Sequence, residues 1–335
     1  MTTSISRRAA LSAALAAAST PLLAQKTTTR PGTVPAGWPN RPLRILVGFP
    51  GGSTPDLVAR TIAEPLGKAL GQPVVVDNKP GAGGNIAADA VAKATDDHTI
   101  GVMINGNMTI AKLLNPATPF DPVRDLAPIS LIGTAPLLLA APANAPGTNA
   151  LDFFAAARNA GNKWSYGSPG IGTVGHIGME LLKTKTNIDP VHVPYPGNPQ
   201  VINAIISGQI QLALLPPGLA AQQVRAGKLK AIGVTSIGRS SLVPEYPSLD
   251  ESGVARAFQL EIWTAAAAPQ SMPKPIVAKL SQLIADIART PEVRQKLFAQ
   301  GWQVAGTSAE GLANRVRNDT ALLGGIIQMR GIKAE

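Results

Sequence analysis

A glycine-rich turn is the segment of this sequence whose spacing most resembles a chemical motif. Residues 170–175 read Gly-Ile-Gly-Thr-Val-Gly, which matches the G-x-G-x-x-G pattern of dinucleotide-binding proteins between an expected strand and an expected helix. That function also needs an acidic residue about 20 positions later, at the end of the next strand, to hold the ribose. Here the strand at 191–193 is followed by Pro194, Tyr195 and Pro196. We therefore expect no nucleotide cofactor, but a turn that directs backbone N–H groups at an anion.

A serine just before this turn could act as a nucleophile. Residues 166–170 read Tyr-Gly-Ser-Pro-Gly, one residue away from the G-x-S-x-G elbow of serine hydrolases, because Tyr166 stands where the first glycine belongs. A general base would come from the three histidines of the chain, His98, His176 and His192. His176 follows Ser168 closely, whereas the hydrolase order places the histidine near the C-terminus. A secreted serine hydrolase using Ser168 is thus a minor alternative, and His176 is better explained as a helix-start residue bonded to its own loop.

The composition of the 335-residue chain excludes other kinds of site. It has no cysteine, which rules out disulfides, thiolate metal sites and thiol catalysis. The histidines are far apart in sequence, so we expect no metal site. The net charge of +10 comes from scattered Lys and Arg without basic runs, which indicates a basic surface rather than nucleic-acid binding.

Short apolar runs alternate with helical stretches from Arg41 onward, which predicts an α/β fold with parallel strands and right-handed crossovers. The expected strands are 43–47, 74–76, 99–104, 164–166, 191–193, 210–215 and 231–234. The expected helices are 56–70, 85–94, 150–160, 174–183, 199–207, 275–288, 291–299 and one after Ser308.

Two further apolar runs, at about 136–142 and 262–268, indicate extended crossings between two lobes. We expect a discontinuous first lobe made of residues 38–138 and 264–335. Residues 139–263 would form the second lobe, inserted between its halves. This is the arrangement of hinged binding proteins.

The N-terminus has the pattern of an export signal. Arg7 and Arg8 precede a short apolar stretch that ends in small residues, as at a signal-peptide cleavage site. Residues 1–24 are therefore predicted to be a secretory signal peptide. The protein would be exported by the twin-arginine or the general secretory route. Residues 25–37 read as a disordered lead-in. No apolar run reaches the roughly 20 residues of a membrane span, so we expect a protein that is soluble in the periplasm after export.

Motifs along the chain add a family resemblance. From about Trp38 to the C-terminus the sequence closely resembles the Bug family of solute receptors, the TctC-like binding components of tripartite tricarboxylate transporters. The resemblance rests on residues 38–44 (WPNRPLR), 49–56 (FPGGSTPD), 71–85 (GQPVVVDNKPGAGGN), 120–125 (FDPVRD), 166–176 (YGSPGIGTVGH), 193–195 (VPY) and 226–229 (AGKL). Each motif by itself is weak evidence for a family, but the complete set in this order is specific to this one.

The resemblance implies a two-lobe periplasmic-binding-protein fold, type II-like, with hinge strands between the lobes. Such a receptor captures a small carboxylate-containing molecule, catalyses no reaction and delivers its ligand to the membrane permease subunits of the transporter. A periplasmic sensor that presents the ligand to a signalling partner is the alternative among binding proteins. We expect a monomer.

The resemblance also implies where the ligand carboxylate is held, in loops at strand ends. The implied binding residues are Phe49, Ser53, Thr54, Asp56, Asn105, Asn107, Ser168, Gly172, Thr173, Tyr195 and Leu215. Ser53 and Asp56 would also cap the helix that they begin. Many relatives have Asp-Asn where this chain has Leu215 and Pro216, and the Asp suits a ligand amino group. We therefore expect a monocarboxylate, a dicarboxylate or an aromatic acid rather than an amino acid.

Overall fold

The structure is a computed structural model that describes residues 33–333. The predicted signal peptide, residues 1–24, lies outside the described residues, as do residues 25–32 of the predicted lead-in. At the start of the described part, Trp38 N–H donates to the carbonyl of Pro35 (3.1 Å) and closes a turn. Within residues 33–333, no helix combines the length and apolar character needed to cross a membrane.

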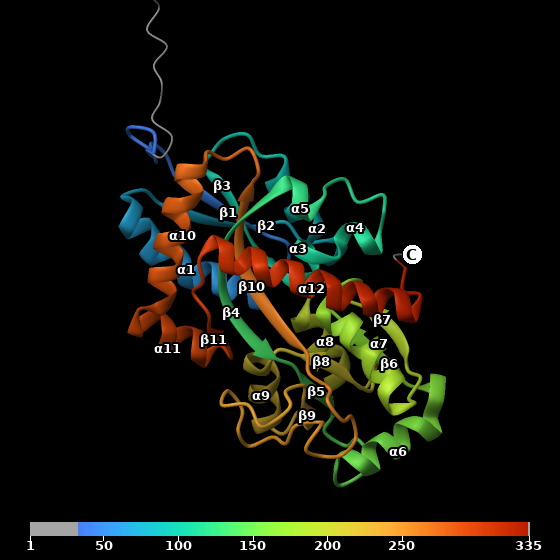
Figure 1. Cartoon of the computed structure of the whole chain (residues 1–335). Helices are drawn as coiled ribbons and strands as arrows, with labels where there is room; N and C mark the ends of the chain where they lie inside the picture. Colours follow the sequence, from blue (N-terminus) through green and yellow to red (C-terminus); the bar gives the residue numbers. More distant parts are fainter. Residues whose placement is uncertain (1–32, 334–335) are drawn as a thin grey trace, which may run out of the picture. The chain divides into compact units, whose positions relative to one another are not determined.

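A six-stranded sheet with the strand order β11-β4-β10-β3-β1-β2 is the centre of the first lobe (Figure 1). Its strands are β1 (Leu43–Val47), β2 (Val74–Asn78), β3 (Thr99–Ile104), β4 (Leu126–Pro136), β10 (Glu261–Pro269) and β11 (Gln303–Val304). β1 pairs in parallel with β2 and β3, as the β–loop–helix repetition predicts. β10 is antiparallel to both β3 and β4, because β4 carries the chain out of this lobe and β10 brings it back.

Two smaller sheets form the second lobe. β8 (Ala213–Leu215), β5 (Leu138–Pro142) and β9 (Leu229–Val234) make a three-stranded antiparallel sheet in that order. β6 (Ser165–Ser168) and β7 (Val191–Pro194) pair in parallel, and a single bridge between Tyr166 and Leu212 connects them to the segment before β8.

Helices cover the strands of both lobes. In the first lobe they are α1 (Thr54–Leu70), α2 (Asn85–Ala92), α3 (Asn105–Thr109), α4 (Ala111–Leu114), α5 (Pro122–Asp125), α10 (Lys274–Arg289), α11 (Pro291–Ala299) and α12 (Ala309–Arg330). In the second lobe they are α6 (Ala150–Ala160), α7 (Val174–Thr186), α8 (Asn198–Ile206) and α9 (Pro217–Arg225).

Both faces of the six-stranded sheet are buried, which is why its strands are almost continuously apolar. Along β1, Leu43, Ile45 and Val47 join one apolar cluster with residues of α1 and α10. Leu46 points to the other face, where it meets residues of α2 and α12. The alternation follows the two-residue period of a strand.

The chain passes between the lobes at two places that lie next to each other. Leu137, between β4 and β5, exchanges hydrogen bonds with Thr235, which follows β9: its N–H donates to the Thr235 hydroxyl (2.8 Å), and the Thr235 N–H donates to its carbonyl (2.9 Å). The Thr235 hydroxyl in turn donates to the carbonyl of Leu260, just before β10 (2.6 Å). One threonine thus ties both crossings together.

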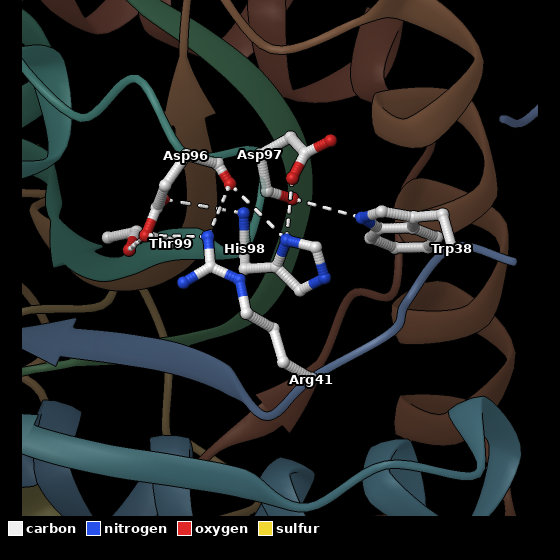
Figure 2. A network of polar contacts seen from close by, with 6 residues as sticks. All are labelled: Trp38, Arg41, Asp96, Asp97, His98 and Thr99. Carbon is white, nitrogen blue, oxygen red and sulfur yellow. Dashed lines mark hydrogen bonds and ion pairs between the residues drawn. The ribbon is translucent and has the colours of Figure 1, made fainter.

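A polar network holds the segment before β1 to the turn before β3 (Figure 2). The indole N–H of Trp38 donates to the carbonyl of Asp97 (3.1 Å), and Arg41 pairs with Asp96 (3.5 Å). The Asp96 carboxylate also accepts from the Thr99 hydroxyl (3.1 Å), and His98 contacts Asp97. His98 therefore belongs to a structural network.

Candidate functional site

A small cavity of about 20 Å³ lies where loops of the two lobes meet. This is about the space that one water molecule needs. Fourteen residues line it: Phe49, Ser53, Thr54, Pro55, Ile104, Leu137, Pro169, Thr173, Val174, Gly175, Asn198, Leu214, Pro216 and Ile262. All fourteen are uncharged.

The N-terminal ends of four helices contribute to this lining. Ser53 to Pro55 begin α1, Thr173 to Gly175 begin α7, Asn198 begins α8, and Pro216 precedes α9. The first N–H groups of a helix have no partner inside the helix and carry part of its positive dipole end. None of these four helix starts has a capping side chain. The start of α9 offers no donor, since Pro216 and Pro217 have no N–H. The cavity thus collects uncapped N–H donors of α1, α7 and α8 without a basic side chain.

Ser53 stands at the N-cap of α1 but does not cap it. Its hydroxyl is buried, with 1% of the residue exposed, and has no hydrogen-bond partner among the described residues. Ser308 and Asn149, in the same position of α12 and α6, do accept backbone N–H bonds from their helices. A buried hydroxyl without a partner costs free energy, so the Ser53 hydroxyl is a hydrogen-bonding group that the protein leaves unused.

Asn198 is a site residue that the sequence did not reveal. Its side-chain N–H donates to the Thr54 hydroxyl (3.3 Å), which links α8 of the second lobe to α1 of the first. Its Oδ1 is buried and has no partner within residues 33–333. The available signal was its place directly after Gly197 at a helix start, which is a common position for ligand-binding donors.

The structure brings together four of the residues predicted from the sequence. Phe49, Ser53, Thr54 and Thr173 all line the cavity, two lobes contributing to one site. The Thr173 hydroxyl donates its proton to the Gly170 carbonyl (2.7 Å). The donors that this segment can offer to the cavity are therefore the backbone N–H groups that follow Thr173.

Asp56 is not among the residues that line the cavity. Its carboxylate accepts bonds from the Gly52 N–H (2.9 Å), from Arg60 (3.1 Å) and from Asn78 (2.9 Å). Burial by itself raises the pKa of Asp56, but these hydrogen bonds lower it more, so the pKa is below its ordinary value. Asp56 therefore fixes the shape of the turn that presents Ser53.

Asn105 and Asn107 follow β3 as predicted, but their side chains bond to protein. Asn107 donates to the carbonyl of Gly83 (2.9 Å) and to Asn85 (2.8 Å), which holds the glycine turn before α2. Asn105 donates to the carbonyl of Glu261 (3.2 Å). Neither residue lines the cavity.

Ser168 is bonded to a histidine, but not to the one nearest in sequence. Its hydroxyl lies 2.7 Å from His192 Nε2 and also contacts the backbone of Gly170. His176 instead accepts the Gly172 N–H through Nδ1 (3.2 Å), as expected for a helix-start residue. Ser168 is fully buried and does not line the cavity, so the serine–histidine pair shapes the glycine-rich turn from behind.

Tyr195 and Leu215 also lie away from the cavity. Tyr195 lines a second, larger pocket of about 440 Å³ between residues 81–85 and 169–171. Leu215 is buried in the apolar cluster of the second lobe, while its neighbours Leu214 and Pro216 face the cavity. The two-residue period of β8 explains the difference.

The two histidines behind the turn predict a loss of stability in mild acid. Burial lowers the pKa of His176 to about 4, and burial together with the charge of His176 lowers that of His192 to about 3. Below the unfolded value of 6.5 the unfolded chain takes up protons that the folded protein refuses. At 1.36 kcal/mol per pH unit, His176 alone should lower the free energy of unfolding by about 3 kcal/mol as the pH falls from 6.5 to 4.

Urea unfolding between pH 7.5 and 4.5 measures this effect. Carboxylates of lowered pKa, such as Asp56, add to the loss only at the acid end of this range, where the unfolded chain begins to take up their protons. His176→Asn keeps an acceptor for the Gly172 N–H but cannot titrate, so its stability should vary less with pH. A variant profile as steep as that of the parent would contradict the assignment to His176.

Fold and cavity together define a class: a two-lobe α/β solute-binding protein with its site between the lobes. A family model described as tripartite tricarboxylate transporter family receptor matches residues 58–332. A UPF0065 protein in the tcbD-tcbE intergenic region of Pseudomonas sp. is 32% identical over 284 residues, which are 84% of this chain and 84% of that protein. The chain belongs to the tripartite tricarboxylate transporter receptor (TctC) family.

Solved structures are similar over nearly the whole described chain. Rpa4515 of R. palustris with adipate has a TM-score of 0.85 at 29% identity, covering 88% of this chain and 99% of that one. MatC of Rhodopseudomonas palustris with bound malate has a TM-score of 0.82 at 30% identity, covering 87% and 100%. The periplasmic binding protein BugD has a TM-score of 0.83 at 30% identity, covering 89% and 100%. The predicted family and fold class are confirmed, and so is the prediction of a receptor rather than an enzyme.

Proposed function

We propose that this protein is the periplasmic receptor of a tripartite tricarboxylate-type transporter and binds a small carboxylate between its two lobes. It delivers the ligand to membrane permease subunits. Two similar structures contain malate and adipate, both carboxylates, as bound ligands of those relatives. Export to the periplasm would depend on the signal predicted at residues 1–24.

One observation carries the proposal: the uncapped starts of α1, α7 and α8 line a single cavity together with the unpartnered hydroxyl of Ser53. Oriented N–H groups at helix ends bind anions without a basic side chain. A carboxylate has oxygens enough to accept several such donors, and it is a pure acceptor when ionised. The ligand would thus satisfy the Ser53 hydroxyl and the uncapped N–H groups that the protein leaves unpaired.

We propose distinct roles for the residues predicted from the sequence. Phe49, Ser53, Thr54 and Thr173 would contact the ligand, and Asn198 would join them. Others would position these contacts from behind: Asp56, Asn105, Asn107, Ser168 and Gly172. Tyr195 would stand at the second pocket between the lobes, and Leu215 would have no part in binding.

Closure about the two crossings would complete the site. Ser53 and Thr54 come from the first lobe, whereas Thr173 and Asn198 come from the second. The lobe boundaries that we propose, at 138/139 and 263/264, are supported by the nearby hydrogen bonds of Thr235 to Leu137 and Leu260. Ligand binding should therefore compact the protein in solution.

Calorimetry with matched acids and amides tests this function. A carboxylate should bind far more tightly than its amide, whose NH2 group would face donors and leave them unpaired. Ser53→Ala should weaken binding about 10- to 100-fold, the effect of losing one hydrogen bond to a charged group. Ser271→Ala, which removes an exposed hydroxyl bonded to Ala94, is the control. Equal affinity for acid and amide, or no compaction by small-angle scattering, would argue against the proposal.

A further inference from the structure

The polar and apolar side chains of the cavity come from different parts of the fold. The polar ones, Ser53, Thr54, Thr173 and Asn198, all lie at helix starts. Three of them are neighbours, because Ser53 precedes Thr54 and Asn198 donates to the Thr54 hydroxyl. The free donors here are the Ser53 hydroxyl and the backbone N–H groups of these helix starts, because the Thr173 hydroxyl and the Asn198 amide N–H already donate to protein atoms. These donors suit one carboxylate.

The remainder of the lining is hydrocarbon supplied by the strands that pass between and join the lobes. Leu137 lies at the crossing after β4, Ile262 in β10, Leu214 in β8, and Ile104 at the end of β3. All four are buried, with at most 7% of their surface exposed. Phe49 and Pro216 extend this apolar surface.

A second carboxylate on the ligand would meet this hydrocarbon surface. An ionised carboxylate buried without a partner loses its hydration and gains no compensating bond. An alkyl chain or an aromatic ring would instead gain from leaving water. The same cavity therefore favours one charged end and disfavours two.

We propose that the physiological ligand is a monocarboxylate with an apolar aliphatic or aromatic body, and that dicarboxylates are rejected. This inference rests on the proposed function, since it assumes that the helix starts hold a carboxylate. It separates this chain from the relatives whose structures contain malate or adipate.

Pairs of acids that differ only in a second carboxylate test the inference on the full mature protein. Hexanoate is matched with adipate, and benzoate with terephthalate, by calorimetry at pH 7.5. The monoacid of at least one pair should bind about 100-fold more tightly than its diacid, which is about 3 kcal/mol at 1.4 kcal/mol per tenfold. A diacid that binds as tightly as its monoacid, or more tightly, would overturn the inference and leave the proposed function intact. Failure of all four acids to bind would overturn both.

Two substitutions at one position provide a second test. Ile262→Thr places a hydroxyl on the apolar surface, whereas Ile262→Val removes one methyl group and adds no polar atom. The ratio of hexanoate to adipate affinity should fall about tenfold in Ile262→Thr relative to Ile262→Val. An unchanged ratio in two variants that both fold, checked by thermal unfolding, would contradict the assignment of this surface to the ligand body.

Discussion

Replacing Gly106 by alanine is expected to weaken ligand binding about 10- to 100-fold without touching the ligand. Gly106 lies in α3 of the first lobe, and an alanine Cβ there would stand 2.4 Å from the carbonyl oxygen of Gly172 in the second lobe. Relief of such a contact costs about 1–3 kcal/mol when the backbone must move. The nearest atoms to this Cβ all belong to Gly172 and Thr173 of the second lobe. The substitution should therefore weaken the contact between the two lobes and leave the packing within the first lobe unchanged.

Calorimetry with the best-binding acid, together with small-angle scattering, measures this effect. Gly238→Ala is the control, because a Cβ at that position meets nothing within 4 Å. The control should bind like the parent, while Gly106→Ala should also compact less on addition of ligand. Parent-like affinity and compaction in Gly106→Ala would mean that closure does not use this contact.

Trp263→Ala is expected to lower the free energy of unfolding by about 3–5 kcal/mol, the usual cost of truncating a buried tryptophan. Trp263 lies in β10, is fully buried, and packs against an apolar cluster that includes Phe120 and Leu312. Its indole N–H donates to the carboxylate of Asp319 (2.5 Å), which connects the central strand to α12. The truncation therefore removes both packing and a bond to a charged acceptor.

Urea unfolding of Trp263→Ala and Trp263→Phe separates the two contributions. The phenylalanine variant keeps most of the packing and loses the hydrogen bond, so it should cost about 2 kcal/mol. Asp319 retains its ion pair with Arg315 (3.0 Å) in both variants. Equal losses in the two variants would show that ring packing contributes little.

Element positions were largely predictable from the sequence. The strand predicted at 43–47 is β1, and the helix predicted at 150–160 is α6, with identical limits. These segments have clear apolar periodicity and glycine or proline at their ends, so their local signals agree with the fold. The strand β4, Leu126–Pro136, was missed before residue 136, because prolines interrupt it and no alternation marks it.

The site was only partly predictable. The Phe49–Asp56 loop and Thr173 do meet, because both lie at the carboxyl ends of strands that lead into helices. Leu215 was chosen as the position facing the ligand, yet the register of β8 turns Leu214 and Pro216 toward the cavity. Asn198 was not chosen at all, since its contact with Thr54 joins residues 144 positions apart.

The sequence by itself determined most of the longer strands and helices, the two-lobe α/β organisation suggested by its crossings, and the family, because these depend on local periodicity and on motifs. The tertiary structure alone decided which side chains share the cavity and which support it. Asp56, Asn107 and Ser168 have the chemistry of ligand-binding residues, yet each is bonded to protein atoms. The physical reason is that hydrogen-bond partners are set by packing between distant segments, which local spacing does not encode.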